Sequence, residues 1–223
     1  MSSLQKRQSC SLCLRPLKTC ICKHVQVVEN KVQVIVLQHP LEVCEAKNTG
    51  RLLHLCLKNS QIYTGEVFDN KIINALPTAI VDSNDTITTT IETPIKDILL
   101  YPDNNENSGS TNEKVLATTE QNISVHSSEL TSLRLWVLDA TWRKSRKILH
   151  LNPWLHRMPR LSLNDCPPSI YKIRKAHSEN QLSTLEASCY ALRQLEQNLV
   201  NYAPIIKALG AFIAEQETFL PSR

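Results

Sequence analysis

Leu133-Arg-Leu-Trp-Val-Leu138, followed by Asp139-Ala-Thr-Trp142 and Arg143-Lys-Ser-Arg-Lys147, is the stretch of sequence that decides the fold. Its first six residues are mostly apolar and too few for a helix, which predicts a buried strand. A helical pattern begins directly after Asp139. Because a buried strand that runs straight into a helix is the building unit of α/β domains, this stretch predicts that class.

The same alternation extends outward from this stretch in both directions. Asn48-Thr49 offers an N-cap to a leucine-rich helix. Two further helices are predicted near the end of the chain, where apolar residues recur at helical spacing over 185–199 and 205–213. Further strands are predicted at 32–37, 61–64, 78–81, 98–101 and 171–174. This order predicts one α/β domain with a mainly parallel sheet, interrupted by a polar insertion around 103–131.

The composition excludes several classes of protein. A chain of 223 residues with 42% hydrophobic residues is large enough for a core and is not disordered overall. No apolar run approaches the roughly 20 residues that cross a bilayer. Four glycines leave no Rossmann or P-loop phosphate motif. The first 23 residues lack the apolar core of a secretory signal, so we expect a cytoplasmic protein with reduced cysteines.

The charge is unevenly distributed along the chain. Residues 1–24 contain five Lys or Arg and no acid, and residues 134–177 contain ten Lys or Arg and two Asp. Between them, residues 59–132 contain three Lys and eleven Asp or Glu. Two basic blocks that flank an acidic one suggest a surface for a polyanion. An ordinary solvated surface explains the same composition equally well.

Four cysteines lie within thirteen residues near the N-terminus. Cys10-x2-Cys13 and Cys20-x-Cys22 form two close pairs, which is the spacing typical of a tetrahedral zinc site. The alternatives are a redox thiol pair and a disulfide framework, and a reducing compartment disfavours the latter. A site with four cysteines has no open position, so the zinc would be structural. We therefore expect residues 1–24 to form a zinc-binding knuckle and the other cysteines to be small buried side chains.

Polar side chains follow two of the predicted strands directly, where open α/β sheets bind ligands. One group is the Asp139 loop, in which a carboxylate at a helix N-terminus would stay ionised as a potential base beside phosphate-binding cations. The alternative is that Asp139 or Thr141 only caps the helix. The other group is His39-Pro40-Leu41-Glu42 with Asn48-Thr49, for which a proline turn and a helix cap are the simpler interpretation.

Two weaker patterns lie near the end of the chain. Ser183-Thr184-Leu185-Glu186 matches a capping box, in which Ser183 and Glu186 satisfy each other's backbone N–H groups. The exposed amides of such a helix start could also meet a carboxylate ligand. Residues 171–175 place Tyr171 among cations, a pattern that suits RNA stacking and phosphate contacts.

Together these residues resemble the DTW-domain tRNA-uridine aminocarboxypropyltransferases along essentially the whole chain. Ala140 departs from the pattern, since the family usually has Gly there, although a small residue is kept. The matching motifs are Cys10-x2-Cys13-Leu14-Arg15-Pro16 with Cys20-x-Cys22, Gln38-His39-Pro40-x-Glu42, Lys47-Asn48-Thr49, Leu99-Leu100-Tyr101-Pro102, Leu138-Asp139-x-Thr141-Trp142, Asn152-Pro153-Trp154-Leu155, Tyr171-x-Ile173-Arg174 and Leu182-Ser183-Thr184-x-Glu186-Ala187.

The resemblance implies transfer of the 3-amino-3-carboxypropyl group of S-adenosylmethionine to N3 of a tRNA uridine, with release of 5′-methylthioadenosine. It also implies a fold similar to the SPOUT methyltransferases for residues 25–223, with a C-terminal knot, a rare exception to the rule against threading. Two other functions stay open. They are a SPOUT-like tRNA methyltransferase, which would deliver the methyl group, and a zinc-bearing RNA-binding protein without catalysis.

On this basis each motif receives an expected role. The reaction is assigned to Asp139, Thr141 and Trp142, with Asp139 as the base. The zinc ligands are Cys10, Cys13, Cys20 and Cys22, and the knuckle is assigned to tRNA together with the basic block. The expected cofactor contacts are Leu100, Tyr101, Pro102, Leu138, Ser183, Thr184 and Glu186; the expected RNA contacts are Arg143, Lys144, Arg146, Lys147, Arg174 and Lys175; and His39, Pro40, Glu42, Asn48 and Thr49 are further motif residues.

Overall fold

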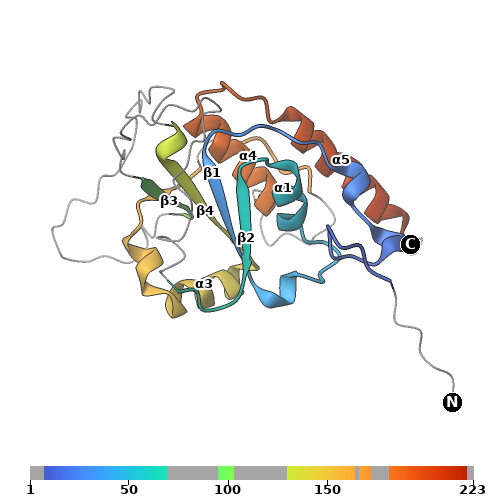
Figure 1. Ribbon diagram of the computed structural model, residues 1–223, viewed down its shortest axis with the longest axis horizontal. Coiled ribbons are helices and arrows are strands. Elements are labelled where there is room, and N and C mark those ends of the chain that lie inside the picture. The colour runs from blue at the N-terminus through green and yellow to red at the C-terminus, as the bar shows by residue number, and fades with distance from the viewer. Residues whose placement is uncertain (1–7, 70–94, 103–129, 164–165, 172–180, 220–223) are drawn as a thin grey trace, which may run out of the picture.

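A five-stranded parallel sheet forms the centre of the molecule (Figure 1). The computed structural model describes residues 8–69, 95–102, 130–163, 166–171 and 181–219. The strands lie in the order β2-β1-β4-β3-β5. The α/β class and the parallel sheet are therefore confirmed. The strands are β1 (Gln33–Gln38), β2 (Ser60–Thr64), β3 (Lys96–Leu100), β4 (Leu133–Asp139) and β5 (Arg160–Leu161).

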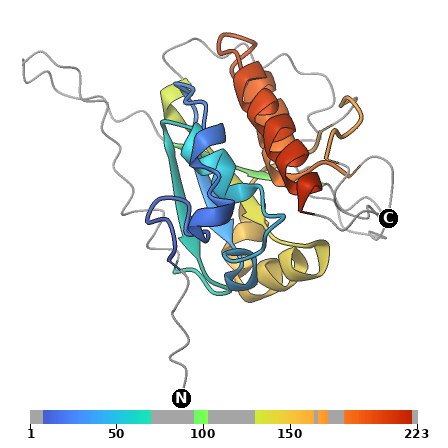
Figure 2. The same ribbon diagram turned by 90° about the vertical axis from the view of Figure 1, so that its right-hand side faces the viewer.

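The two faces of the sheet are covered by different helices, because side chains alternate along each strand. Val36 and Val137 face the core that includes α1 (Gly50–Cys56), α4 (Thr184–Leu195) and α5 (Ala203–Thr218). Leu37 and Trp136 face the opposite core, which includes α3 (Trp142–Leu151) and the 3-10 helix η5 (Pro153–Arg157). Figure 1 shows α5 at the upper right of the strands and α3 below them, and in Figure 2 α5 again lies above α3.

A crevice between the carboxyl ends of β1 and β4 is where this topology favours a ligand. β1 leads through α1 to β2 on one side, whereas β4 leads through α3 to β5 on the other. Loops that depart in opposite directions from adjacent parallel strands leave a crevice at the switch point. The register pairs Gln38 at the end of β1 with Asp139 at the end of β4.

The N-terminal cysteine segment packs against the body of the domain. It includes two short 3-10 helices, η1 (Leu17–Thr19) and η2 (Cys22–His24). Cys13 and Ile21 are each 1% exposed and belong to the same core as α5. The Glu215 side chain on α5 contacts His24 and forms an ion pair of 2.8 Å with Lys23.

Several predicted elements differ from those in the structure or lie outside the described residues. The predicted strand at 78–81 and nearly all of the insertion lie outside the described residues, although Leu130–Ser132 form a 3-10 helix (η4). Tyr171 lies outside any strand, and 172–174 are not described. The edge strand β5 was not predicted, because two residues are too few to show alternation. The helix predicted to reach residue 199 ends at Leu195. Shortly after it, Gln197 and Asn198 have positive φ angles of 49° and 61°, which a right-handed helix does not allow.

Within the described residues, no helix has both the length and the apolar composition needed to cross a bilayer.

Candidate active site and metal centre

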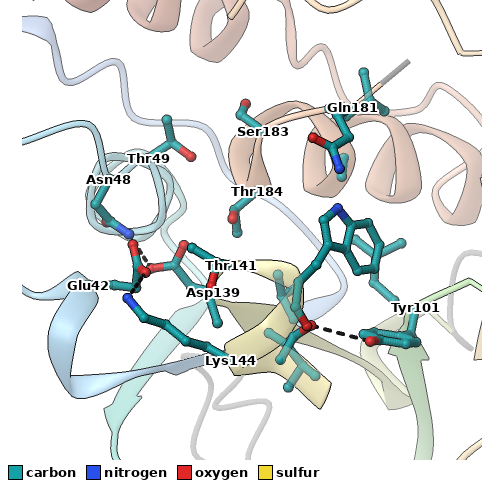
Figure 3. A pocket seen from close by; sticks show the side chains of 18 of the residues that line it. Glu42, Asn48, Thr49, Tyr101, Asp139, Thr141, Lys144, Gln181, Ser183 and Thr184 are labelled. Atoms are coloured by element: carbon teal, nitrogen blue, oxygen red, sulfur yellow. Dashed lines mark hydrogen bonds and ion pairs between the residues drawn. The ribbon is translucent and has the colours of Figure 1, made fainter. Parts of the chain in front are cut away.

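A cavity of about 890 Å³ opens at the carboxyl ends of the central strands (Figure 3). Its floor includes residues at the ends of β3 and β4, and the N-terminus of α4 lies opposite. This volume lies in the range of small-molecule and cofactor pockets. The predicted residues that line it are Glu42, Asn48, Thr49, Leu100, Tyr101, Pro102, Leu138, Asp139, Thr141, Trp142, Arg143, Lys144, Arg146, Ser183 and Thr184.

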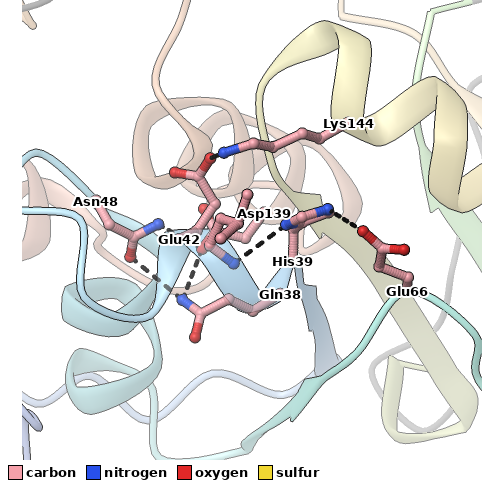
Figure 4. Close-up of polar contacts among 8 residues, drawn as sticks. Gln38, His39, Glu42, Asn48, Glu66, Asp139 and Lys144 are labelled. Atoms are coloured by element: carbon pink, nitrogen blue, oxygen red, sulfur yellow. Dashed lines mark hydrogen bonds and ion pairs between the residues drawn. The ribbon is translucent and has the colours of Figure 1, made fainter.

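Asp139 is held by neutral donors from two neighbouring segments (Figure 4). Its Oδ2 accepts hydrogen bonds from Gln38 Nε2 at 2.8 Å and from Asn48 Nδ2 at 2.6 Å. Asn48 Oδ1 accepts from the backbone N–H of Arg51 at 3.1 Å, so the amide of Asn48 can only turn its NH2 group toward Asp139. Of the cap predicted at Asn48-Thr49, Thr49 is the N-cap residue but makes no side-chain capping bond, and the Asn48 side chain accepts from the N–H of the first turn.

Burial dominates the ionisation of Asp139. Asp139 is only 2% exposed, and this removal from water raises the pKa of its carboxyl group. Hydrogen bonds from Gln38, Asn48 and Thr184 oppose this shift by stabilising the anion. We expected the helix N-terminus to keep the group ionised, but the net direction is upward, because desolvation outweighs the donors. A carboxylate with a raised pKa is a stronger base than an exposed one.

The alternative role of this loop as a simple helix cap is wrong. Thr141 is the N-cap residue of α3, but its side chain makes no capping hydrogen bond. Asp139 is the last residue of β4, and its carboxylate is directed to Gln38 and Asn48. Neither side chain therefore caps α3, and both residues line the cavity.

The other predicted loop divides into a structural part and a part that faces the cavity. The His39 ring accepts from the backbone N–H of Leu41 and lies 2.7 Å from a Glu66 oxygen. It caps the 3-10 helix η3 (Pro40–Glu42), so the simpler interpretation is confirmed for His39 and Pro40. Glu42, by contrast, lines the cavity and pairs with Lys144 Nζ at 2.7 Å.

The four cations of α3 are not equivalent. Lys144 pairs with Glu42, and Lys147 pairs with Glu66 at 2.6 Å. Arg143 and Arg146 line the cavity and have no ion-pair partner in the described part of the chain. The remaining predicted RNA contacts, Arg174 and Lys175, lie outside the described residues. Only the two arginines of this helix therefore present unpaired charge to a polyanion at the cavity.

Glu186 differs from the other predicted cofactor contacts. It is fully buried, and its carboxylate accepts from Ser169 Oγ and from the backbone N–H groups of Ile170 and Ser183. The predicted capping box of α4 is confirmed, but Glu186 is not among the residues that line the cavity. Its role is to hold Ser169, Ile170 and Ser183, because both carboxylate oxygens accept from these residues.

An aromatic pair, Tyr101 and Trp142, also lines the cavity. Trp142 is 48% exposed, and its ring meets that of Tyr101 edge-to-face with centroids 5.7 Å apart. The Tyr101 hydroxyl lies 3.3 Å from Ser145 Oγ. Tyr171, which was expected to stack on RNA, is instead buried and donates its hydroxyl to the Lys47 carbonyl. Of the three described aromatic residues that line the cavity, Trp142 is the most exposed and is therefore available to a planar ligand.

The four N-terminal cysteines form a cluster that could hold a metal ion. Their sulfur atoms all lie within 4.8 Å of one another, and the Cys10–Cys22 and Cys13–Cys20 pairs are each 3.7 Å apart. Sulfurs placed tetrahedrally at ~2.3 Å from zinc lie about 3.8 Å apart, so the geometry fits. Backbone N–H groups of Cys13 and Leu12 lower the pKa of Cys10 to about 6, which favours its thiolate, whereas burial raises the pKa of Cys22. Of the other cysteines, Cys56 and Cys189 are buried as expected, Cys166 is half-buried, and Cys44 is exposed, against expectation.

Comparison with known proteins assigns the chain to a family. A family model described as "DTW domain" matches residues 7–217. The chain belongs to the DTW domain family. Two relatives named tRNA-uridine aminocarboxypropyltransferase 2 are similar to it: one from Drosophila melanogaster, 29% identical over 195 residues, and one from Mus musculus, 26% identical over 217 residues. These matches cover 86% and 95% of this chain but 68% and 64% of the relatives, about two thirds of their length. No solved structure was found to match the chain.

Two residues of this DTW domain that position Asp139 were not assigned a role from the sequence. Gln38 was quoted in a motif, and its place opposite Asp139 follows only from the register of β1 and β4. Gly50 begins α1, and a Cβ atom there would lie 2.3 Å from Asp139 Cγ. The signal for Gln38 was its position at the end of a predicted strand, whereas Gly50 carried no local signal.

Proposed function

We propose that this chain transfers the 3-amino-3-carboxypropyl group of S-adenosylmethionine to N3 of a tRNA uridine and releases 5′-methylthioadenosine. The observation that carries the proposal is the buried Asp139 carboxylate at the switch-point cavity of a DTW domain. The names of the similar proteins from Drosophila melanogaster and Mus musculus support the reaction and the tRNA substrate.

The proposed reaction needs a base and a fixed orientation. Uridine N3 attacks the Cγ carbon of the donor, Asp139 accepts the N3 proton, and the Cγ–S bond breaks. Its electron pair passes to sulfur, so the positively charged sulfonium leaves as a neutral thioether. Because the raised pKa brings Asp139 closer to neutral pH, its carboxylate is better matched to a weakly acidic N–H group.

Selectivity for Cγ over the methyl carbon requires that the methionine part of the donor be anchored. The N-terminus of α4 faces the cavity at Ser183 and Thr184, where a helix start favours a carboxylate. Leu100, Tyr101 and Leu138 supply an apolar wall for the remainder of the donor. Holding both partners in a reactive geometry would provide much of the acceleration.

The proposal includes a structural zinc, a knuckle and a knot. We assign zinc to Cys10, Cys13, Cys20 and Cys22 within residues 1–24, and the SPOUT-like catalytic domain to residues 25–223. The C-terminal knot is proposed from the resemblance to the SPOUT-like fold; within the described residues, α4 packs against α1 and β4. Reduced thiols in the four-cysteine cluster suit a cytoplasmic protein.

The by-product tests the reaction, because each candidate function leaves a different one. Purified protein is incubated with S-adenosylmethionine and total tRNA, and the small molecules are identified by mass spectrometry. We expect methylthioadenosine together with a tRNA uridine that has gained the aminocarboxypropyl group. S-adenosylhomocysteine would instead identify a methyltransferase. Binding of tRNA without either product would indicate an RNA-binding protein.

The unpaired arginines of α3 give a second prediction. Replacing Arg143 and Arg146 with alanine should weaken tRNA binding and reduce the slope of log affinity against log salt by about 2, because two phosphate contacts are lost. Affinity measured by filter binding at several salt concentrations checks this. The matched control is Lys31→Ala with Lys207→Ala, which removes the same charge from two exposed lysines, one before β1 and one on α5. An equal loss in the control would mean that overall charge, not this helix, attracts tRNA.

A further inference from the structure

Arg15 lies inside the cysteine knuckle but is directed into the molecule. It follows Cys13 by two residues, is 6% exposed, and its guanidinium lies over the Phe212 ring at 5.0 Å. Its Nη1 donates to the Ala46 carbonyl and its Nη2 to the Asn48 carbonyl, each at 2.8 Å. A cation in this position is not available to an RNA phosphate, although the knuckle as a whole was assigned to tRNA.

These contacts hold the loop that carries Asn48. The Lys47 carbonyl, which lies between the two carbonyls that Arg15 binds, accepts a hydrogen bond from the Tyr171 hydroxyl. Three successive carbonyl groups, from Ala46 to Asn48, are therefore fixed by side chains from outside the loop. The Asn48 side chain then donates to Asp139 at 2.6 Å. The position of this donor depends on the backbone that Arg15 holds.

The cysteine centre in turn fixes Arg15. The Arg15 carbonyl accepts from the Cys10 N–H at 2.8 Å, and the Cys10 carbonyl accepts from the Leu14 N–H at 2.9 Å. Leu14 has a φ angle of 62°, a left-handed conformation that only a tightly held turn keeps in a non-glycine residue. Cys10, Cys13 and the Arg15 backbone therefore belong to one turn, and the sulfurs of Cys20 and Cys22 lie within 4.8 Å of the two sulfurs of this turn.

We propose that Arg15 is a positioning residue for Asp139, through which the four-cysteine centre acts on catalysis as well as on stability. The connection runs from the cysteine turn to Arg15, to the loop at 46–48, to Asn48 and to the carboxylate. The planar guanidinium has two donors at a fixed separation that match two carbonyls, which a lysine ammonium cannot reproduce. This inference rests on the proposed function, because it assigns Asp139 a role in turnover.

The first test compares the kinetics of variants of the whole chain. In Arg15→Met we expect kcat to fall roughly tenfold with KM for tRNA little changed, since an unpositioned base affects the reaction step and not binding. Arg15→Lys, which keeps the charge, should lose a similar amount. The matched control is Arg193→Met, an exposed arginine on α4, which should retain full activity. A rise in KM with unchanged kcat would overturn the proposal and return Arg15 to tRNA binding.

A double-mutant cycle separates this role from general destabilisation. If Arg15 acts through Asn48, then Arg15→Met should cost little further activity in an Asn48→Ala background. Fold-losses that simply multiply would contradict the connection. Absence of methylthioadenosine from the wild-type protein would instead refute the proposed function itself, so the two failures are distinguishable.

A further measurement does not depend on activity. Zinc content should remain about one per chain in Arg15→Met, because the four ligands are untouched. Amide hydrogen exchange at residues 45–51 should be faster in this variant, and also in the wild-type protein after a chelator removes the metal. Unchanged exchange in both samples would show that neither Arg15 nor the metal centre holds the loop, and would overturn the inference.

Discussion

Replacing Asp139 with asparagine should lower turnover by roughly 10²–10⁴-fold while the fold and the affinity for S-adenosylmethionine are retained. The amide cannot accept the proton of uridine N3, yet it is nearly isosteric with the carboxylate. Its oxygen can take the place of Oδ2 and accept from Gln38 and Asn48, so the buried donors keep a partner. The loss should therefore appear in kcat, measured with saturating donor and tRNA.

The pH dependence of the wild-type enzyme provides a second readout for Asp139. A base works in its ionised form, which exists above its pKa, and burial raises that pKa above its usual 3.8. Activity should therefore be lost as the pH falls, and at a higher pH than for an exposed aspartate. The residual activity of Asp139→Asn should not show this acidic limb. Unchanged turnover in the variant would mean that Asp139 only orders Gln38 and Asn48.

Replacing Gly50 with alanine should lower turnover about 10²-fold, because it displaces the same carboxylate. The added Cβ would lie 2.3 Å from Asp139 Cγ and from Oδ2, well inside any real contact distance. Either the carboxylate or the start of α1 must shift, and Asn48 lies beside both. Steady-state kinetics of the purified variant check the prediction.

Gly210→Ala is the matched control for this change. Gly210 lies within α5, and a Cβ there meets nothing within 4 Å among the described residues. Alanine at this position should raise the free energy of unfolding by about 0.5–1 kcal/mol without affecting turnover, since glycine is the poorer helix former. If Gly50→Ala kept full turnover, the close approach of α1 to Asp139 would not matter for the reaction.

The pairing of the α3 cations shows where the charge pattern of the sequence was incomplete. Residues 134–177 are strongly basic, and this block was assigned to tRNA as a whole. Lys144 is instead paired with Glu42, which lies 102 residues earlier in the chain, and Lys147 is paired with Glu66, which lies 81 residues earlier. A count of charges along the chain cannot distinguish these lysines from Arg143 and Arg146.

Local patterns in the sequence determined the elements of this protein. The apolar run at 133–138 predicted β4, and the polar start of α4 predicted its capping box, because both depend on residues that are neighbours in the chain. The spacing of the four cysteines likewise predicted their cluster. Each of these features is complete within about a dozen residues, which is why the sequence alone was sufficient.

The tertiary structure alone decided how these elements make a site. The strand order places Gln38 opposite Asp139, the approach of α1 requires Gly50, and the inward direction of Arg15 connects the knuckle to the Asn48 loop. Glu186 was expected at the cofactor and proved to hold Ser169 and Ile170 instead. The partners in these contacts are up to a hundred residues apart in the chain. These residues come into contact only because particular faces of the helices and strands pack together. The periodicity and spacing of residues along the chain do not specify which faces those are.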